Sequence, residues 1–230
     1  MVAGVVLTLV LNFELLGARP APTDDFLQNV ISGFEWDTAR WPVDFAASAL
    51  FAIGFGALGL LGSLLARLAA PGDSRGPILG GALLLAGGLG VAAQLVWIGA
   101  KPIATSPELC ECGLLAEEVM SRLMTLNIVS GVQTWLTNGA IVAAAAGLVV
   151  AARPGVRAGM PSAWATLAYV TAAAAIVLVV LSALRAYPFD LIAVALVAAV
   201  LLPVWALWLA QGAGRLRWED VHVDEPRDVP

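Results

Sequence analysis

Residues 101–152 read KPIATSPELCECGLLAEEVMSRLMTLNIVSGVQTWLTNGAIVAAAAGLVVAA, and this stretch decides the fold class. Its first part, residues 101–124, is polar and contains both cysteines of the protein. Its second part, residues 125–152, is apolar and exceeds the roughly 20 residues that a helix needs to cross a bilayer. A polar loop that leads into such a segment predicts a membrane protein.

The composition of the whole chain gives the same fold class. Hydrophobic residues make up 60% of the 230 residues and charged residues only 13%, and the mean hydropathy is +0.88. Soluble domains carry about 25% charged residues. We therefore predict an all-α protein, a polytopic transmembrane helical bundle that lies in a lipid bilayer.

The apolar runs predict about six spans within one membrane domain, residues 1–210. The first run is short, and Asn12 and Glu14 interrupt it, but we interpret it as a span. A polar cytoplasmic tail, residues 211–230, follows the domain. The predicted spans are residues 2–17, 45–70, 78–100, 125–152, 162–184 and 191–210.

Two longer loops, residues 18–44 and 101–124, are each expected to contain a short amphipathic helix. Residues 26–34 place apolar side chains at helical spacing behind a Thr23/Asp24 cap. Leu114–Met124 is the second such segment. Both helices are expected to lie outside the hydrocarbon region.

The arginines indicate how the chain is oriented. In the six-span arrangement, six arginines near the cytoplasmic ends of the spans fall on one side of the membrane, in turns much shorter than the two long loops on the other side. Because Lys and Arg favour the cytoplasmic side, we predict a prokaryotic plasma-membrane protein with both termini in the cytoplasm. The two longer loops then face outward. The arginines concerned are Arg67, Arg75, Arg153, Arg157, Arg215 and Arg217.

The first candidate site is centred on Cys110 and Cys112. Cysteines outside the cytoplasm are usually oxidised, so a structural disulfide is the main expectation and no cofactor is required. Alternatively, the two thiolates together with Met120 and Met124 could bind copper as Cu(I), which favours thiolate and thioether ligands. A third interpretation is a thiol-redox pair.

The second candidate site is a polar stripe on the fourth predicted span. Asn127, Gly131, Thr134 and Asn138 follow one another at i, i+4, i+7 and i+11, which is one face of a helix. Gln94 on the third span could bond toward them. We favour hydrogen bonds between helices, each contributing about 0.6–2 kcal/mol, over a path for a solute.

Glu14 is the third candidate, because a carboxylate inside a membrane is costly and needs a partner or access to water. We place Glu14 near the outer interface, where it could pair with Arg19. Glycines are treated as structural, since small residues let helix backbones approach closely. They are frequent on the second and third spans, at Gly54, Gly56, Gly59, Gly62, Gly80, Gly81, Gly87, Gly88 and Gly90.

These features predict a function based on contacts rather than catalysis. The only histidine is His222 in the tail, and no basic cluster is present for nucleic acid. We therefore predict a non-enzymatic accessory or scaffolding subunit that contacts other membrane subunits or further copies of itself. The alternatives are a small-solute or ion transporter that uses the stripe, and a copper-handling or thiol-redox protein centred on the cysteines.

Overall fold

The computed structural model describes residues 2–12, 20–68, 75–105, 116–157, 159–184 and 196–212. Within these ranges all regular structure is helical, which confirms the all-α prediction. The elements are α1 (Val2–Asn12), α2 (Phe26–Leu68), α3 (Arg75–Thr105), α4 (Ala116–Arg157), α5 (Ser162–Ala183), the π-helix η2 (Leu196–Leu201) and α7 (Leu202–Gly212).

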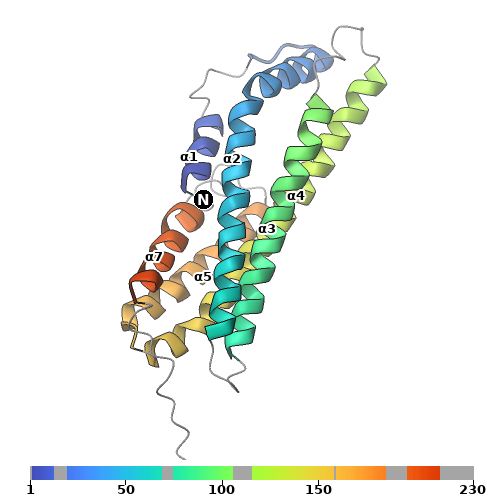
Figure 1. The fold of residues 1–230 in the computed structure, drawn as a ribbon. Helices are drawn as coiled ribbons and strands as arrows, with labels where there is room; N and C mark the ends of the chain where they lie inside the picture. Colours follow the sequence, from blue (N-terminus) through green and yellow to red (C-terminus); the bar gives the residue numbers. More distant parts are fainter. Residues whose placement is uncertain are drawn as a thin grey trace, which may run out of the picture.

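Four of these helices, α2 to α5, are long and apolar enough to cross a membrane. Figure 1 shows α2, α3 and α4 running side by side along the bundle. The end where α2 finishes, α3 begins and α4 finishes carries Arg75 and Arg157 and is called the arginine end here. The opposite end is called the pocket end.

The first and sixth predicted spans are not confirmed. Helix α1 has 11 residues and rises about 16 Å, roughly half of a 30 Å hydrocarbon core. Glu14 and the rest of residues 13–19 lie outside the described part of the chain. The sixth predicted span is described only from Leu196, where η2 leads directly into α7.

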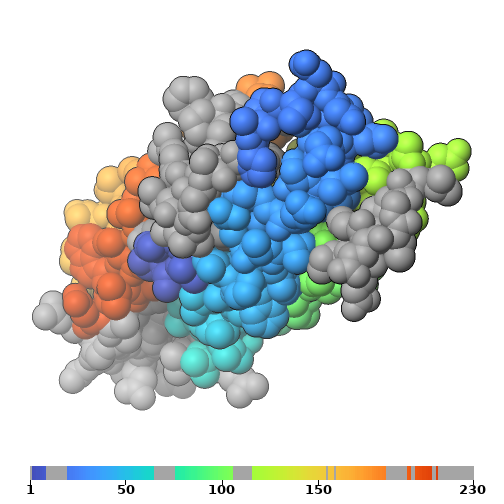
Figure 2. Space-filling view, turned by 90° about the horizontal axis from the view of Figure 1, so that it is seen from above, coloured from blue at the N-terminus to red at the C-terminus, as the bar shows by residue number. Residues whose placement is uncertain are grey.

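Helix α1 also begins at an unexpected position along the length of the bundle. A Cβ on Gly4 would lie 3.1 Å from the carbonyl oxygen of Ala47 and 3.1 Å from the ring of Phe51. Figure 1 shows the start of the chain beside the middle of α2, and Figure 2 shows α1 between α2 and α7. The first described residues therefore do not start at the arginine end, and the cytoplasmic position of both termini stays a prediction.

The two predicted loop helices are parts of longer helices. Helix α2 has 43 residues and contains both the predicted surface helix and the second span, with Pro42 inside it. Helix α4 has 42 residues and starts at Ala116, within the second predicted loop helix. A proline within a helix commonly bends it, and in Figure 1 the first turns of α2 lie across the pocket end.

The cap of α2 also differs from the prediction. Asp25 Oδ1 accepts hydrogen bonds from the backbone amides of Leu27, at 2.8 Å, and Gln28, at 3.3 Å. Asp25, rather than Thr23 or Asp24, is therefore the N-cap residue. Its side chain satisfies amides that have no partner within the first helical turn.

Glycines hold α2 and α3 in close contact, which confirms the predicted tight packing at these positions. A Cβ on Gly87 would lie 2.7 Å from Gly59 Cα, and one on Gly90 would lie 2.1 Å from the ring of Phe55. Both distances are far below van der Waals contact, so only glycine fits. The prediction is wrong for Gly81 and Gly88, which face open space.

Toward the arginine end, the core lies between α4, α5 and α7. The rings of Trp164 and Trp205 stack with their centroids 5.2 Å apart, and both side chains are buried. Gly155 leaves room for Trp164, because a Cβ there would lie 2.2 Å from the ring. Leu148 of α4 is fully buried in the same cluster.

Candidate functional site

The most unusual group of side chains lies at the pocket end, where α3 continues past its predicted limit at residue 100. Lys101, in this added part of α3, is only 7% exposed. Its Nζ lies 2.5 Å from Asp44 Oδ2 and 3.5 Å from Asp37 Oδ1, both on α2. An ammonium group is therefore buried between two carboxylates.

Asp44 is the more tightly held of the two carboxylates. Its Oδ2 also accepts a hydrogen bond of 3.1 Å from Trp97 Nε1. Trp97 and Lys101 are four residues apart on α3 and therefore lie on the same face, with Lys101 Nζ 5.0 Å from the centre of the Trp97 ring. Indole, ammonium and carboxylate form one connected cluster.

Asp37 is held less closely. Its 3.5 Å distance to Lys101 Nζ exceeds the roughly 2.7–2.9 Å of a charge-assisted hydrogen bond. Among the described residues it accepts no hydrogen bond, and its side chain is 24% exposed. Lys101 is therefore shared between two carboxylates, and of the two Asp37 is the farther from its ammonium group.

The depth of the cluster follows from the geometry of α3. From Ile78 to Trp97 the helix rises about 29 Å, which matches a hydrocarbon core of about 30 Å. Lys101 lies about 6 Å farther along the axis. With α3 spanning the membrane in this register, the cluster lies at the level of the lipid headgroups, where tryptophan is favoured.

One further hydrogen bond joins the start of α2 to the end of α3, and two other polar contacts each lie within a single helix. Thr38 Oγ1 donates to the Thr105 carbonyl at 2.7 Å, and Thr105 Oγ1 donates to the Lys101 carbonyl at 3.0 Å. The Arg40 guanidinium lies 4.0 Å from the centre of the Trp36 ring. The Thr38–Thr105 hydrogen bond holds the part of α2 that carries Asp37 beside the part of α3 that carries Lys101.

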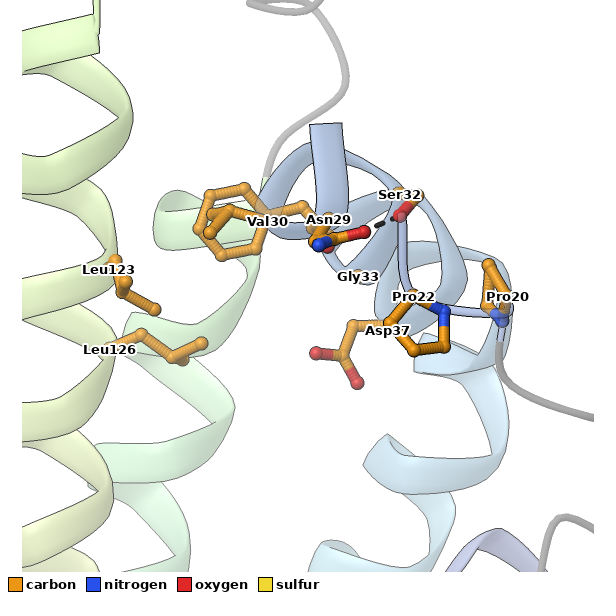
Figure 3. Close-up of a pocket in the computed structure, with 10 residues that line it drawn as sticks. Pro20, Pro22, Asn29, Val30, Ser32, Gly33, Asp37, Leu123 and Leu126 are labelled. Carbon is orange, nitrogen blue, oxygen red and sulfur yellow. Dashed lines mark hydrogen bonds between the residues drawn. The ribbon is translucent and has the colours of Figure 1, made fainter. Parts of the chain in front are cut away.

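A pocket of about 390 Å³ opens beside Asp37. Figure 3 shows the Asp37 carboxylate directed into the space between the start of α2 and the side chains of Leu123 and Leu126 on α4. Most of the lining is apolar, and Asn29, Ser32 and Asp37 supply its polar side chains. The lining residues are Pro20, Pro22, Asn29, Val30, Ser32, Gly33, Phe34, Asp37, Leu123 and Leu126.

One wall of the pocket is the extended segment before α2, and two side chains pin it in place. Asn29 Nδ2 donates to the Thr23 carbonyl at 2.7 Å. In return, the Thr23 amide and Thr23 Oγ1 donate to Asn29 Oδ1 at 2.7 and 3.0 Å. This reciprocal bonding holds Pro22, which flanks Thr23, against the pocket.

Of the predicted cysteine site, the structure describes only the two methionines. Cys110 and Cys112 lie outside the described ranges, so the disulfide has no support here and stays a prediction. Met120 and Met124 are 47% and 67% exposed on the surface of α4. Within the described part of the chain, no three His, Cys, Asp or Glu side chains are grouped as metal ligands, and the copper site is likewise untested.

The predicted polar stripe changes environment along α4. Asn127 and Thr134 are exposed, whereas Asn138 is 4% exposed and its Nδ2 has no hydrogen-bond partner. Thr134 Oγ1 donates to the Ser130 carbonyl at 2.8 Å. Gln94 of α3 is also buried. The stripe is therefore partly a surface and partly an internal contact.

The ion cluster was not predicted, because Asp37, Asp44 and Lys101 were assigned to loops. Two spacings contain the signal that could have found it. Trp97 and Lys101 are four residues apart, and Asp37 and Asp44 are seven apart, so each pair shares one face of a helix.

Comparison with known proteins gives no further guide to this site, because no family model, curated protein or solved structure matches the chain.

Proposed function

We propose that the protein is a non-enzymatic membrane scaffold whose chains associate through one surface of α4. This surface, called the α4 face, consists of Met120, Met124, Asn127, Gly131 and Thr134. A single observation carries the proposal: the stripe is exposed at Asn127 and Thr134 and half-buried at Gly131, yet it is buried at Asn138. The same face of one helix is thus covered in one half and uncovered in the other.

The lengths of α4 and α5 explain why the stripe changes from exposed to buried along α4. Helix α5 has 22 residues and follows α4 after a short connection, so it can cover about the last 22 residues of α4. Asn138 lies 19 positions before Arg157 and is within that reach, whereas Asn127 lies 30 positions before it. The α4 face therefore continues an existing helix interface beyond the end of α5.

Gly131 and Thr134, in the part of the α4 face nearest to the membrane span, are residue types typical of helix contacts in membranes. Met120, Met124 and Asn127 lie at the level of the pocket, which Leu123 and Leu126 of the same part of α4 line. Small residues permit close approach, and amides and hydroxyls can bond across an interface. Gly131 has nothing within 4 Å of the position of a Cβ, which leaves room for a neighbouring helix.

The same side chains support a second copy as the partner. The Asn127 side chain contains both donors and an acceptor, so two copies related by a two-fold axis could bond to each other through the same residue. Dimers with this symmetry are the commonest oligomers. Because Asn127 and Thr134 lie on the outside of the bundle, they support an interface over a solute path through it.

Cysteine cross-linking in native membranes tests the proposal. In a background with Cys110→Ser and Cys112→Ser, Thr134→Cys should give a disulfide-linked dimer when oxidised. Val132→Cys is the matched control, because Val132 is also exposed and lies at nearly the same depth, but away from the stripe. It should stay monomeric.

Three results would contradict self-association through the α4 face. The two variants could cross-link equally, neither could cross-link, or Thr134→Cys could form an adduct only with a different protein. The last result would identify a heterologous subunit and would replace the second copy as the partner.

A further inference from the structure

We propose that the pocket beside Asp37 binds a primary ammonium group attached to a short apolar segment, with Asp37 as its counter-ion. The proposal concerns the pocket end of the bundle and is independent of the α4 face. It rests on the charge of the cluster, on the lining of the pocket and on its depth.

The charges favour a cation. Asp44 has two donors, Lys101 Nζ at 2.5 Å and Trp97 Nε1 at 3.1 Å. Within the described part of the chain, the ion pair of Asp37 is the longer one, at 3.5 Å from the same ammonium group, so a single Lys101 is shared between two carboxylates. A partly buried carboxylate without a close partner favours the binding of an opposite charge.

The lining favours a ligand with both polar and apolar parts. Val30, Phe34, Leu123 and Leu126 give the pocket an apolar surface. Ser32 Oγ donates to the Asn29 carbonyl at 3.2 Å, which leaves its oxygen able to accept a hydrogen bond. An ammonium group has three donors, and Asp37 and Ser32 supply acceptors within one pocket.

The lining also favours a primary ammonium over a quaternary one. Quaternary ammonium groups carry no N–H donor and are typically held in cages of aromatic rings. Of the described residues that line this pocket, one is aromatic, namely Phe34. A carboxylate and a hydroxyl match a group that donates hydrogen bonds better.

At the depth of this pocket, a primary ammonium group could come from two sources. At the level of the headgroups, the aminoethyl group of phosphatidylethanolamine could reach the pocket from the membrane. A small free amine could instead enter from the aqueous side. At about 390 Å³, the pocket is near the lower end of the usual range for small-molecule sites, which suits a small group.

The test uses the full-length protein in phosphatidylcholine nanodiscs. We expect n-butylammonium to raise the melting temperature in a saturable manner, and n-butyltrimethylammonium to have much less effect at equal concentration. Asp37→Asn should weaken the apparent affinity at least about tenfold, the usual effect of losing a charged hydrogen bond. Glu35→Gln is the matched control, since it removes an exposed carboxylate from the same helix and should leave the affinity unchanged.

A second arm distinguishes the two sources. If the lipid is a ligand, replacing part of the phosphatidylcholine with phosphatidylethanolamine should raise the melting temperature of the unmodified protein. The increase should be smaller for Asp37→Asn. An effect of n-butylammonium alone would identify a free amine. Either result supports the proposal.

A second variant that keeps the Asp37 carboxylate makes the test independent of a folding defect in Asp37→Asn. Leu126→Trp should fill the pocket and abolish the response while Asp37 is still present. The proposal is overturned when neither the amine nor the lipid changes the melting temperature, or when Asp37→Asn and Leu126→Trp respond as fully as the unmodified protein.

Discussion

Helices α2 and α3 are joined in two different ways along their length. In the middle, Gly59 and Gly87 bring the two backbones into direct contact, with no side chain between them. At the pocket end, Lys101, Asp44 and Trp97 join the same helices through charge and hydrogen bonds. The glycine contact leaves no space between the backbones, whereas the polar contact joins the two helices through side chains. The pocket lies beside this polar contact, between the start of α2 and α4.

The largest expected effect would break the glycine contact. Gly87→Leu should cost more than about 4 kcal/mol and prevent the bundle from folding, because a Cβ there meets the backbone of Gly59, which cannot move aside. Gly88→Leu is the control, since Gly88 faces open space, and it should be nearly neutral. Thermal unfolding in detergent, followed by size-exclusion chromatography, measures both. Equal loss in the two variants would contradict the packing described.

The next effect concerns the ion cluster. Lys101→Met should cost about 3 kcal/mol, since it leaves two carboxylates near each other without their cation. Adding Asp44→Asn should recover part of this loss in the same unfolding measurement. The comparison variant is Arg122→Met, which breaks the surface pair with Glu118 and should cost no more than about 0.5 kcal/mol.

A smaller effect tests the hydrogen bond within the cluster. Trp97→Phe keeps most of the ring but removes the donor to Asp44, and should cost about 1.5 kcal/mol. Trp135→Phe changes an exposed ring on α4 and should have little effect. If chemical denaturation gives the same midpoint for both variants, the indole bond contributes nothing measurable.

The smallest effect is expected at the buried end of the stripe. Asn138 Nδ2 has no partner, so Asn138→Leu should change stability by less than about 1 kcal/mol and could increase it. Unfolding measurements on this variant sharpen the contrast with Lys101, where a buried polar group is paired. A loss of more than about 2 kcal/mol would contradict an unpaired Asn138 Nδ2.

The residues also show which parts of the fold could be predicted. Apolar run lengths predicted the spans that became α2 to α5, and small-residue spacing predicted the contact around Gly87 and Gly90. Helix ends were harder, because Pro42 and Lys101-Pro102 are signals that usually end a helix. Here α2 and α3 continue through them, and this continuation brings Lys101 to Asp37 and Asp44.

The candidate site was not predicted for the same reason. The spacings place Trp97 with Lys101, and Asp37 with Asp44, on one helix face each, but they do not place the two faces against each other. Charged residues at the edge of an apolar run are usually assigned to the solvated loop that follows. Only the relative positions of two helices, set by glycine contacts many residues away, show that Lys101 meets Asp44. The pocket depends in addition on the bend of α2, whose direction is set by packing rather than by Pro42 alone.

Because α2 is bent, Lys101 contacts residues on both sides of the bend. Asp37 precedes Pro42 and Asp44 follows it, so one ammonium group is bonded to both arms of a bent helix. A proline removes the backbone hydrogen bond that would otherwise stiffen this point. The bend at Pro42 is therefore stabilised by a side chain of α3. A rotation of the part of α2 before Pro42 would change the Lys101–Asp37 distance before it changed the Lys101–Asp44 distance.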